Sequence, residues 1–135
     1  MDILRADYIL FLDDLRIPLD VYSYTGNPIY LRNNWKIVRD YNQFVSYIQK
    51  NGLPKAISFD HDLGCEAYRK CIGVKTINYE ELEEKTGYHA AKWLVEYCMD
   101  NGFIELPTYY IHTMNPVGGK NIQKLFINYT KHRND

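Results

Sequence analysis

The segment Tyr8-Ile9-Leu10-Phe11-Leu12-Asp13-Asp14 decides the fold, because an apolar run leads directly into two carboxylates. The segment Ala56-Ile57-Ser58-Phe59-Asp60-His61-Asp62 repeats this pattern later in the chain. Short apolar runs that are bounded by turn signals are typical of buried strands. Ligands of open α/β sheets bind beyond the carboxyl ends of the strands. The two segments therefore predict one acidic site that is built from distant parts of the chain.

A third apolar run, Tyr109-Tyr110-Ile111, ends in His112 and leads into Asn115-Pro116-Val117-Gly118-Gly119-Lys120-Asn121. Helix N-termini expose N–H groups that favour anions, and glycines let a ligand approach the backbone. This run therefore predicts a histidine and a phosphate-binding turn at the same edge of the sheet. The turn lacks the pattern of a P-loop, so a plain turn into a helix is the alternative.

The composition favours a single globular domain over residues 1–135. The formal net charge of −1 argues against a protein that coats duplex nucleic acid or binds a membrane through basic residues. No apolar stretch approaches the roughly 18 residues of a membrane span, and the N-terminus lacks the signature of a secretory signal. Three cysteines without a C-x-x-C pair predict reduced thiols. We therefore expect a cytoplasmic protein.

Hydrophobic periodicity predicts four strands and three helices. The predicted strands are 8–13, 35–38, 56–60 and 108–112, and the predicted helices are 42–51, 86–101 and 117–131. The stretches 15–34 and 64–78 are predicted to be irregular, and long connections of this kind are usually functional loops. The alternation of strands with helices predicts a parallel sheet that is covered by helices.

Carboxylates at the two predicted strand ends suggest a cation site. Mg²⁺ prefers oxygen ligands, so Asp13, Asp14 and Asp60 are the candidate ligands of Mg²⁺ or another divalent cation. The alternative for Asp13 and Asp14 is a turn in which the side chains bond the local backbone. Chemistry without a metal is also compatible with these residues, because histidines can move protons unaided.

Two histidines are the candidate acid and base. In Asp60-His61-Asp62, the two carboxylates can orient the His61 imidazole, raise its pKa or bind metal. His112 is predicted to reach the same edge of the sheet from another strand. We therefore expect His61, His112, Asp60 and Asp62 to carry the chemistry, with turn residues as the structural alternative.

Several polar residues near the predicted strand ends could hold a phosphate. Thr86 is the expected cap of the helix over 86–101, and His89 on that helix faces either the site or solvent. Arginine suits bidentate contacts with phosphate, although surface arginines are common. The candidate phosphate-binding residues are Thr86, His89, Thr113, Asn115, Gly118, Lys120, Asn121, Arg16 and Arg39.

Five stretches of the chain resemble motifs of the cyclic-phosphate processing receiver-like domains. They are Phe11–Pro18, Ile57–Gly64, Thr86–Tyr88, Ala91–Leu94 and His112–Asn121, and together they span nearly the whole chain. The resemblance implies a receiver-like, flavodoxin-type α/β/α sandwich with a short, mostly parallel sheet. It also implies that Asp13, Asp14 and Asp60 occupy the magnesium-binding positions of ordinary receivers. His112 stands where such receivers carry Thr or Ser, and no clear fifth strand with a lysine follows, which argues against a phosphorelay role.

The same resemblance implies processing of cyclic phosphates in nucleotide signalling and in conflict between phages and bacteria. Our leading hypothesis is a phosphoesterase that hydrolyses a cyclic phosphodiester of a nucleotide or oligonucleotide. The rival hypotheses are a module that binds and sequesters a cyclic nucleotide, and a phospho-receiver or interaction domain. Small α/β proteins often form symmetric dimers, so a homodimer is also compatible with the sequence.

Overall fold

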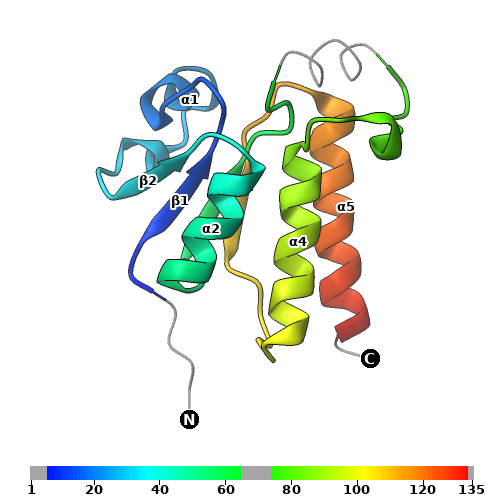
Figure 1. The fold of residues 1–135 in the computed structure, drawn as a ribbon. Helices are drawn as coiled ribbons and strands as arrows, with labels where there is room; N and C mark the ends of the chain where they lie inside the picture. Colours follow the sequence, from blue (N-terminus) through cyan, green and yellow to red (C-terminus); the bar gives the residue numbers. More distant parts are fainter. Residues whose placement is uncertain (1–5, 65–73, 134–135) are drawn as a thin grey trace.

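A computed structural model describes residues 6–64 and 74–133 of the chain (Figure 1). Most of the stretch 64–78, which we expected to be irregular, lies outside the described residues, as do Cys65 and Cys71. Cys98 is buried in the core.

One sheet of four parallel strands organises the molecule, in the order β2-β1-β3-β4. The strands are β1 (Ile9–Leu12), β2 (Trp35–Val38), β3 (Ala56–Phe59) and β4 (Thr108–Ile111). Leu12 pairs with both Val38 and Phe59, and Phe59 pairs with Ile111, so all four strands end at the same level. The residues that directly follow the strands at this shared edge are Arg39, Asp13, Asp60 and His112.

Helices cover both faces of the sheet. They are α1 (Pro18–Thr25), α2 (Tyr41–Asn51), α4 (Gly87–Asp100) and α5 (Pro116–Arg133), with the 3-10 helices η1 (Pro28–Leu31) and η2 (Tyr79–Glu81). Helices α2, α4 and α5 pack on one face, and α1 with η1 packs on the other (Figure 1). The predicted three-layer α/β/α fold with a parallel sheet is therefore confirmed.

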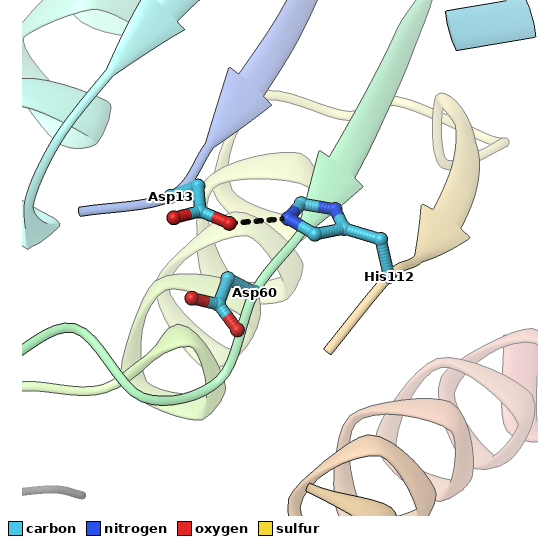
Figure 2. Close-up of side chains that lie close together, drawn as sticks. All are labelled: Asp13, Asp60 and His112. Atoms are coloured by element: carbon cyan, nitrogen blue, oxygen red, sulfur yellow. Dashed lines mark hydrogen bonds and ion pairs between the residues drawn. The ribbon is translucent and has the colours of Figure 1, made fainter. Parts of the chain in front are cut away.

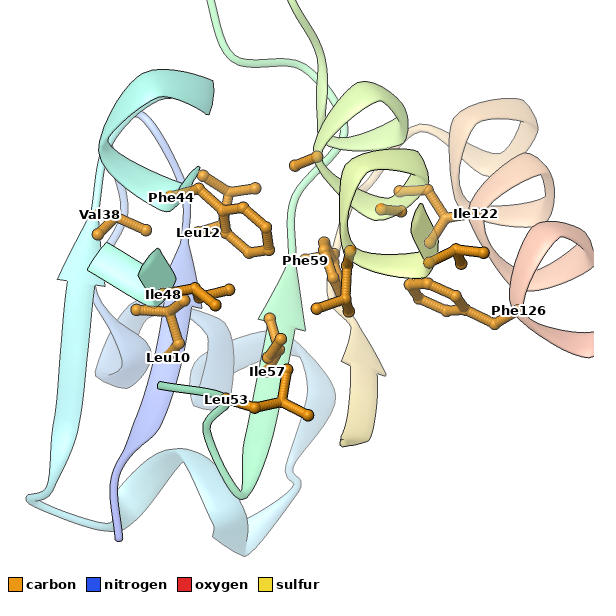
Figure 3. Packing of buried hydrophobic residues seen from close by; sticks show 14 of the residues in the cluster. Leu10, Leu12, Val38, Phe44, Ile48, Leu53, Ile57, Phe59, Ile122 and Phe126 are labelled. Carbon is orange, nitrogen blue, oxygen red and sulfur yellow. The ribbon is translucent and has the colours of Figure 1, made fainter. Parts of the chain in front are cut away.

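Alternation along the strands separates two cores, because successive side chains point to opposite faces. Leu10 and Leu12 of β1 face the larger core, where Phe44 of α2 and Phe126 of α5 are fully buried (Figure 3). Phe11 faces the smaller core beneath α1 and η1. The central strands β1 and β3 are thus buried on both faces, as is usual for parallel sheets, and the carboxyl edge of the sheet is left for polar groups.

The prediction of an irregular stretch over 15–34 was wrong, because α1 and η1 lie within it. Pro18 begins α1 with a backbone suited to the first helical position, and the Asp20 carboxylate accepts a hydrogen bond from the Ile17 N–H. Asn27 caps η1 by accepting from the Ile29 N–H. These short helices rely on proline and side-chain caps and not on a long apolar stripe, which is why periodicity did not reveal them.

The other elements lie within one or two residues of their predicted bounds. Within the described ranges, none of the helices combines the length and apolar character that crossing a membrane requires.

Candidate functional site

Asp13 is the most constrained carboxylate at the strand ends, and its side chain is fully buried. Its Oδ1 accepts hydrogen bonds from the N–H groups of Leu15, at 2.9 Å, and Arg16, at 2.8 Å. Its Oδ2 lies 3.0 Å from Nε2 of His112 (Figure 2). Burial alone would raise the pKa of Asp13, but the His112 and backbone hydrogen bonds outweigh it and lower that pKa. Asp13 is therefore held as a charged acceptor.

His112 lies within a buried chain of hydrogen bonds behind Asp13. Its Nδ1 lies 2.6 Å from Oγ of Ser58, and that oxygen lies 2.7 Å from the hydroxyl of Tyr30. The Asp13 carboxylate can only accept, so the proton of His112 sits on Nε2 and Nδ1 accepts from Ser58. The His112 ring also stacks on Phe11, with the ring centroids 4.6 Å apart. Burial lowers the pKa of His112, so the imidazole is held neutral as a donor to Asp13.

Asp60 is the carboxyl group of the site whose pKa lies near neutral pH. It is buried, and its Oδ1 accepts a hydrogen bond of 2.8 Å from the His61 N–H. Burial, followed by the nearby negative charge of Asp13, raises the pKa of Asp60 to about 7. A carboxyl group with such a pKa can gain or lose a proton near neutral pH, as a general acid or base must.

Asp13, Asp60 and His112 each offer an atom to a common point, and these atoms all lie within 4.8 Å of one another (Figure 2). Among the described residues, this is the one group with the geometry of a cation site. Two carboxylates fit Mg²⁺ or Mn²⁺, and an imidazole ligand favours the transition metals. To use Nε2 as a ligand, His112 would have to give up its hydrogen bond to Asp13. The donor set therefore fits a divalent cation best through the two carboxylates.

Asp14 is set apart from these three residues, because its side chain is exposed. Partial desolvation of the Asp14 carboxyl by the neighbouring chain, followed by the negative charge of Asp13, nevertheless raises its pKa. Asp14 is thus placed at the outer rim of the site, and its role as a metal ligand stays a prediction.

His61 forms a second cluster on the α5 side of the strand ends. Its ring is fully buried, with Nδ1 2.6 Å from Oδ1 of Asp62 and Nε2 2.8 Å from the hydroxyl of Tyr79. The Asp62 oxygen also accepts from the side-chain amide of Asn115, and the Tyr79 hydroxyl accepts from that of Asn121. Asp62 lies in the loop after β3, Tyr79 lies in η2, and Asn115 and Asn121 lie just before and within α5, so three separate parts of the chain hold this imidazole.

Two glycines allow the backbone to close around His61. A Cβ atom at Gly118 would lie 2.3–2.6 Å from atoms of the His61 ring. A Cβ atom at Gly87 would overlap the backbone carbonyl of Asp60, and the Gly87 N–H donates to the His61 carbonyl. The glycine of the predicted phosphate-binding turn therefore serves the packing of α5 against His61.

The helix N-termini already use many of their N–H groups. At α5, Gly118 N–H donates to the side chain of Asn115 and Gly119 N–H donates to its carbonyl. At α4, Thr86 is a buried cap that accepts from Tyr88 N–H, and its own N–H donates to His89 Nδ1. Both ends are thus closed by internal caps, which leaves their dipoles as the main attraction for an anion.

The basic candidates differ in what their side chains contact. Arg16 is partly exposed, with Nη1 3.6 Å from Oδ2 of Asp13 and Nη2 3.2 Å from the sulfur of Met114. Arg39 donates to the backbone carbonyls of Asp13 and Arg16, so it braces the turn after β1. Lys120 is exposed on the first turn of α5.

The remaining candidates lie between the two clusters or at their margin. Thr113 is half-buried after β4, and its hydroxyl interacts with the Asp60 carboxyl and lowers the pKa of that group. His89 is half-buried on α4, and burial followed by the charge of Lys85 lowers its pKa. His89 Nδ1 accepts from the Thr86 N–H in the cap of α4, and its ring packs edge-on against Tyr79 of the His61 cluster, with the centroids 5.4 Å apart. Its role in phosphate binding stays a prediction.

Three residues of the two clusters were missed by the sequence reasoning, namely Ser58, Tyr30 and Tyr79. Ser58 did carry a signal, because a hydroxyl inside a buried strand needs a hydrogen-bond partner. Tyr30 and Tyr79 belong to segments without clear periodicity, and no spacing rule links them to a histidine.

The family model of the cyclic-phosphate processing receiver domain matches residues 8–128. The match includes every residue of both histidine clusters, and the chain belongs to this family. No curated protein and no solved structure matched the chain.

Proposed function

We propose that this member of the cyclic-phosphate processing receiver family is a phosphoesterase that hydrolyses a cyclic phosphodiester of a nucleotide or oligonucleotide. The observation that carries the proposal is the meeting of Asp13, Asp60 and two hydrogen-bonded histidine clusters at one edge of the sheet. Such a set can supply an acid, a base and a cation site for one reaction. A role in phage–bacterium conflict would follow if the substrate is a signalling nucleotide.

Asp60 suits the proton transfer in this reaction, because its pKa of about 7 lets it carry or release a proton at neutral pH. The hydrogen bond from His112 keeps Asp13 ionised, and this negative charge lies next to Asp60. In a metal-bound site Asp60 would be an ionised ligand and not the proton carrier, and a divalent cation held by Asp13 and Asp60 would neutralise charge on the phosphate and lower the pKa of a bound water. Among the candidate basic residues, Lys120 is exposed and Arg16 is partly exposed, so both could meet a phosphate, whereas the partly exposed Arg39 donates to backbone carbonyls.

Product formation tests the proposal directly. The protein is incubated with a panel of cyclic mono-, di- and trinucleotides, with Mg²⁺, with Mn²⁺ and with EDTA, and the products are separated by chromatography. We expect a linear nucleotide from at least one member of the panel. Intact ligands throughout the panel would contradict the phosphoesterase proposal.

One observation favours a second candidate, a module that sequesters a cyclic nucleotide without cleaving it. Both ring nitrogens of His61 and of His112 already have hydrogen-bond partners inside the protein. A site that only binds its ligand can keep these hydrogen bonds, because it needs no histidine to exchange a proton with the ligand. Equilibrium dialysis with the same panel separates the two candidates. Tight binding with full recovery of intact ligand would favour sequestration, and labelling of Asp60 by acetyl phosphate would instead favour a phospho-receiver.

A further inference from the structure

We propose that Tyr79 is the nucleophile of this phosphoesterase, activated by His61 and Asp62, an inference that rests on the proposed function. The observation is a continuous hydrogen-bonded set in which Asp62 contacts His61 Nδ1 at 2.6 Å and Tyr79 contacts His61 Nε2 at 2.8 Å. A hydroxyl within hydrogen-bond reach of a base, which is itself oriented by a third group, is the arrangement of an activated nucleophile.

The direction of the hydrogen bonds agrees with this role. The Asp62 carboxylate can only accept, so the ring proton of His61 sits on Nδ1. His61 Nε2 is then an acceptor, and the Tyr79 hydroxyl donates to it. The Asn121 amide donates to the same hydroxyl oxygen at 3.0 Å, which would stabilise negative charge as the phenol loses its proton.

The neighbouring residues fix this geometry and leave the Tyr79 side chain partly exposed to a ligand. His61 is fully buried, and its ring packs closely against Gly118. It can therefore act on a ligand only through its hydrogen-bond partners. Tyr79 is half-buried on η2, and its ring stacks on Tyr88 with the centroids 4.3 Å apart. Asp62 also contacts His61 and is partly exposed, but Tyr79 is the member of this set that presents a hydroxyl to the accepting ring nitrogen.

The reaction has two balanced steps. In the first, the Tyr79 oxygen bonds to phosphorus, its proton passes to His61 Nε2, and one P–O bond of the cyclic ester breaks. The leaving oxygen takes a proton from solvent, so the opened nucleotide is joined to Tyr79 through a phosphodiester and His61 keeps the proton of the phenol. In the second, water attacks phosphorus and releases a proton to solvent. The bond to Tyr79 breaks, and the phenolate takes its proton back from His61 Nε2.

Asp62 and Asn115 are positioning residues in this scheme. The Asn115 amide lies 3.3 Å from the Asp62 oxygen that also contacts His61. Together they hold the imidazole in the tautomer that accepts from Tyr79 and stabilise the imidazolium that exists while Tyr79 is bonded to phosphorus.

The stereochemical course at phosphorus tests the role of Tyr79. The probe is a chiral cyclic phosphorothioate of the panel nucleotide that is turned over fastest, hydrolysed in heavy-oxygen water and read by phosphorus NMR. Two displacements through Tyr79 predict overall retention of configuration. Inversion with active enzyme would overturn the role of Tyr79 and leave the phosphoesterase proposal intact. A wild-type protein that turns over no member of the panel would contradict both.

A matched pair of variants supports the same test. Tyr79→Phe should lower kcat by about a thousandfold or more with KM changed far less, because the ring and its stacking remain. Tyr88→Phe removes a neighbouring hydroxyl and keeps its ring, and it should retain kcat within about threefold. Equal losses in the two variants, or a Tyr79→Phe enzyme with near-normal kcat, would overturn the proposal.

Discussion

The two histidine clusters are built from the same kinds of residue but end differently. His112 connects Asp13 to Ser58 and then to Tyr30, and all four side chains are buried. His61 connects Asp62 to Tyr79, and these outer members keep part of their surface exposed.

This difference in exposure determines whether each imidazole can exchange a proton with a ligand. A hydrogen-bonded chain that ends inside the core can orient a carboxylate but cannot exchange protons with a ligand. A chain that ends at a half-buried phenol can do so. We therefore regard His112 as the support of Asp13 and His61 as the base behind Tyr79.

The strongest test of the His112 cluster is Asp13→Ala. This change leaves the N–H groups of Leu15 and Arg16 and the ring N–H of His112 without their acceptor. We expect the free energy of unfolding in urea to fall by about 3 kcal/mol or more. Asp14→Ala is the matched control and should change it by no more than about 0.5 kcal/mol. Similar losses in both variants would show that Asp13 has no special structural role.

The His61 cluster can be broken by Gly118→Ala, since the added methyl would overlap the His61 ring. We expect a loss of about 1–3 kcal/mol in the free energy of unfolding, together with a large loss of turnover. Gly119→Ala on the same helix meets only methyl groups of Thr113 and Ile111, at 3.2 and 3.4 Å, and should be nearly neutral. An active, stable Gly118→Ala protein would show that the contact between α5 and His61 is not needed.

The pH dependence of stability reports on Asp60, which lies between the clusters. Its pKa is about 7 in the folded protein and 3.8 for an unperturbed carboxyl, so the folded state holds a proton that the unfolded state has lost. Stability from this group is therefore complete below about pH 4 and is lost as the pH rises to about 7, at up to about 1.4 kcal/mol per pH unit.

Thermal unfolding of metal-free wild type and Asp60→Asn across this pH range measures the effect. The asparagine variant should show a flatter profile and a higher Tm than wild type at pH 8. Addition of Mn²⁺ or Mg²⁺ should raise the Tm of wild type more than that of the variant. Parallel pH profiles for the two proteins would mean that Asp60 titrates as an ordinary carboxyl.

The smallest effect is expected for Tyr30→Phe, at the inner end of the His112 cluster. The change removes one hydrogen bond to Ser58 and keeps the ring that packs against Phe11 and Trp35. We expect a loss of about 1 kcal/mol in urea unfolding. Ser58→Ala should cost more, because it removes a partner from both Tyr30 and His112. A larger loss of unfolding free energy in Tyr30→Phe than in Ser58→Ala would mean that the Tyr30 hydroxyl, and not Ser58, contributes most to the stability of the cluster.

Much of the fold could be predicted because each strand is a short apolar run that ends in a polar residue. The registers of the strands then bring Asp13, Asp60 and His112 together, as the common-edge argument requires. Helix α1 was missed, since its short sequence has no apolar stripe and depends on Pro18 and Asp20.

The site was less predictable, because its hydrogen bonds join residues that are far apart in the chain. Tyr79 meets His61 across 18 positions, and Ser58 meets His112 across 54. The sequence placed Gly118 in a phosphate-binding turn, whereas the structure adds a steric reason for glycine there. That reason depends on the position of the His61 ring, which no local pattern encodes.

The measurement that tests the difference between the clusters most directly is the turnover of a cyclic phosphodiester by Tyr79→Phe and Tyr30→Phe. Each variant removes one hydroxyl from the tyrosine of one histidine cluster. We predict that Tyr79→Phe loses about a thousandfold or more in kcat, whereas Tyr30→Phe stays within about threefold of wild type. Equal losses in the two variants, or a larger loss in Tyr30→Phe, would contradict the assignment of His61 to catalysis and His112 to support.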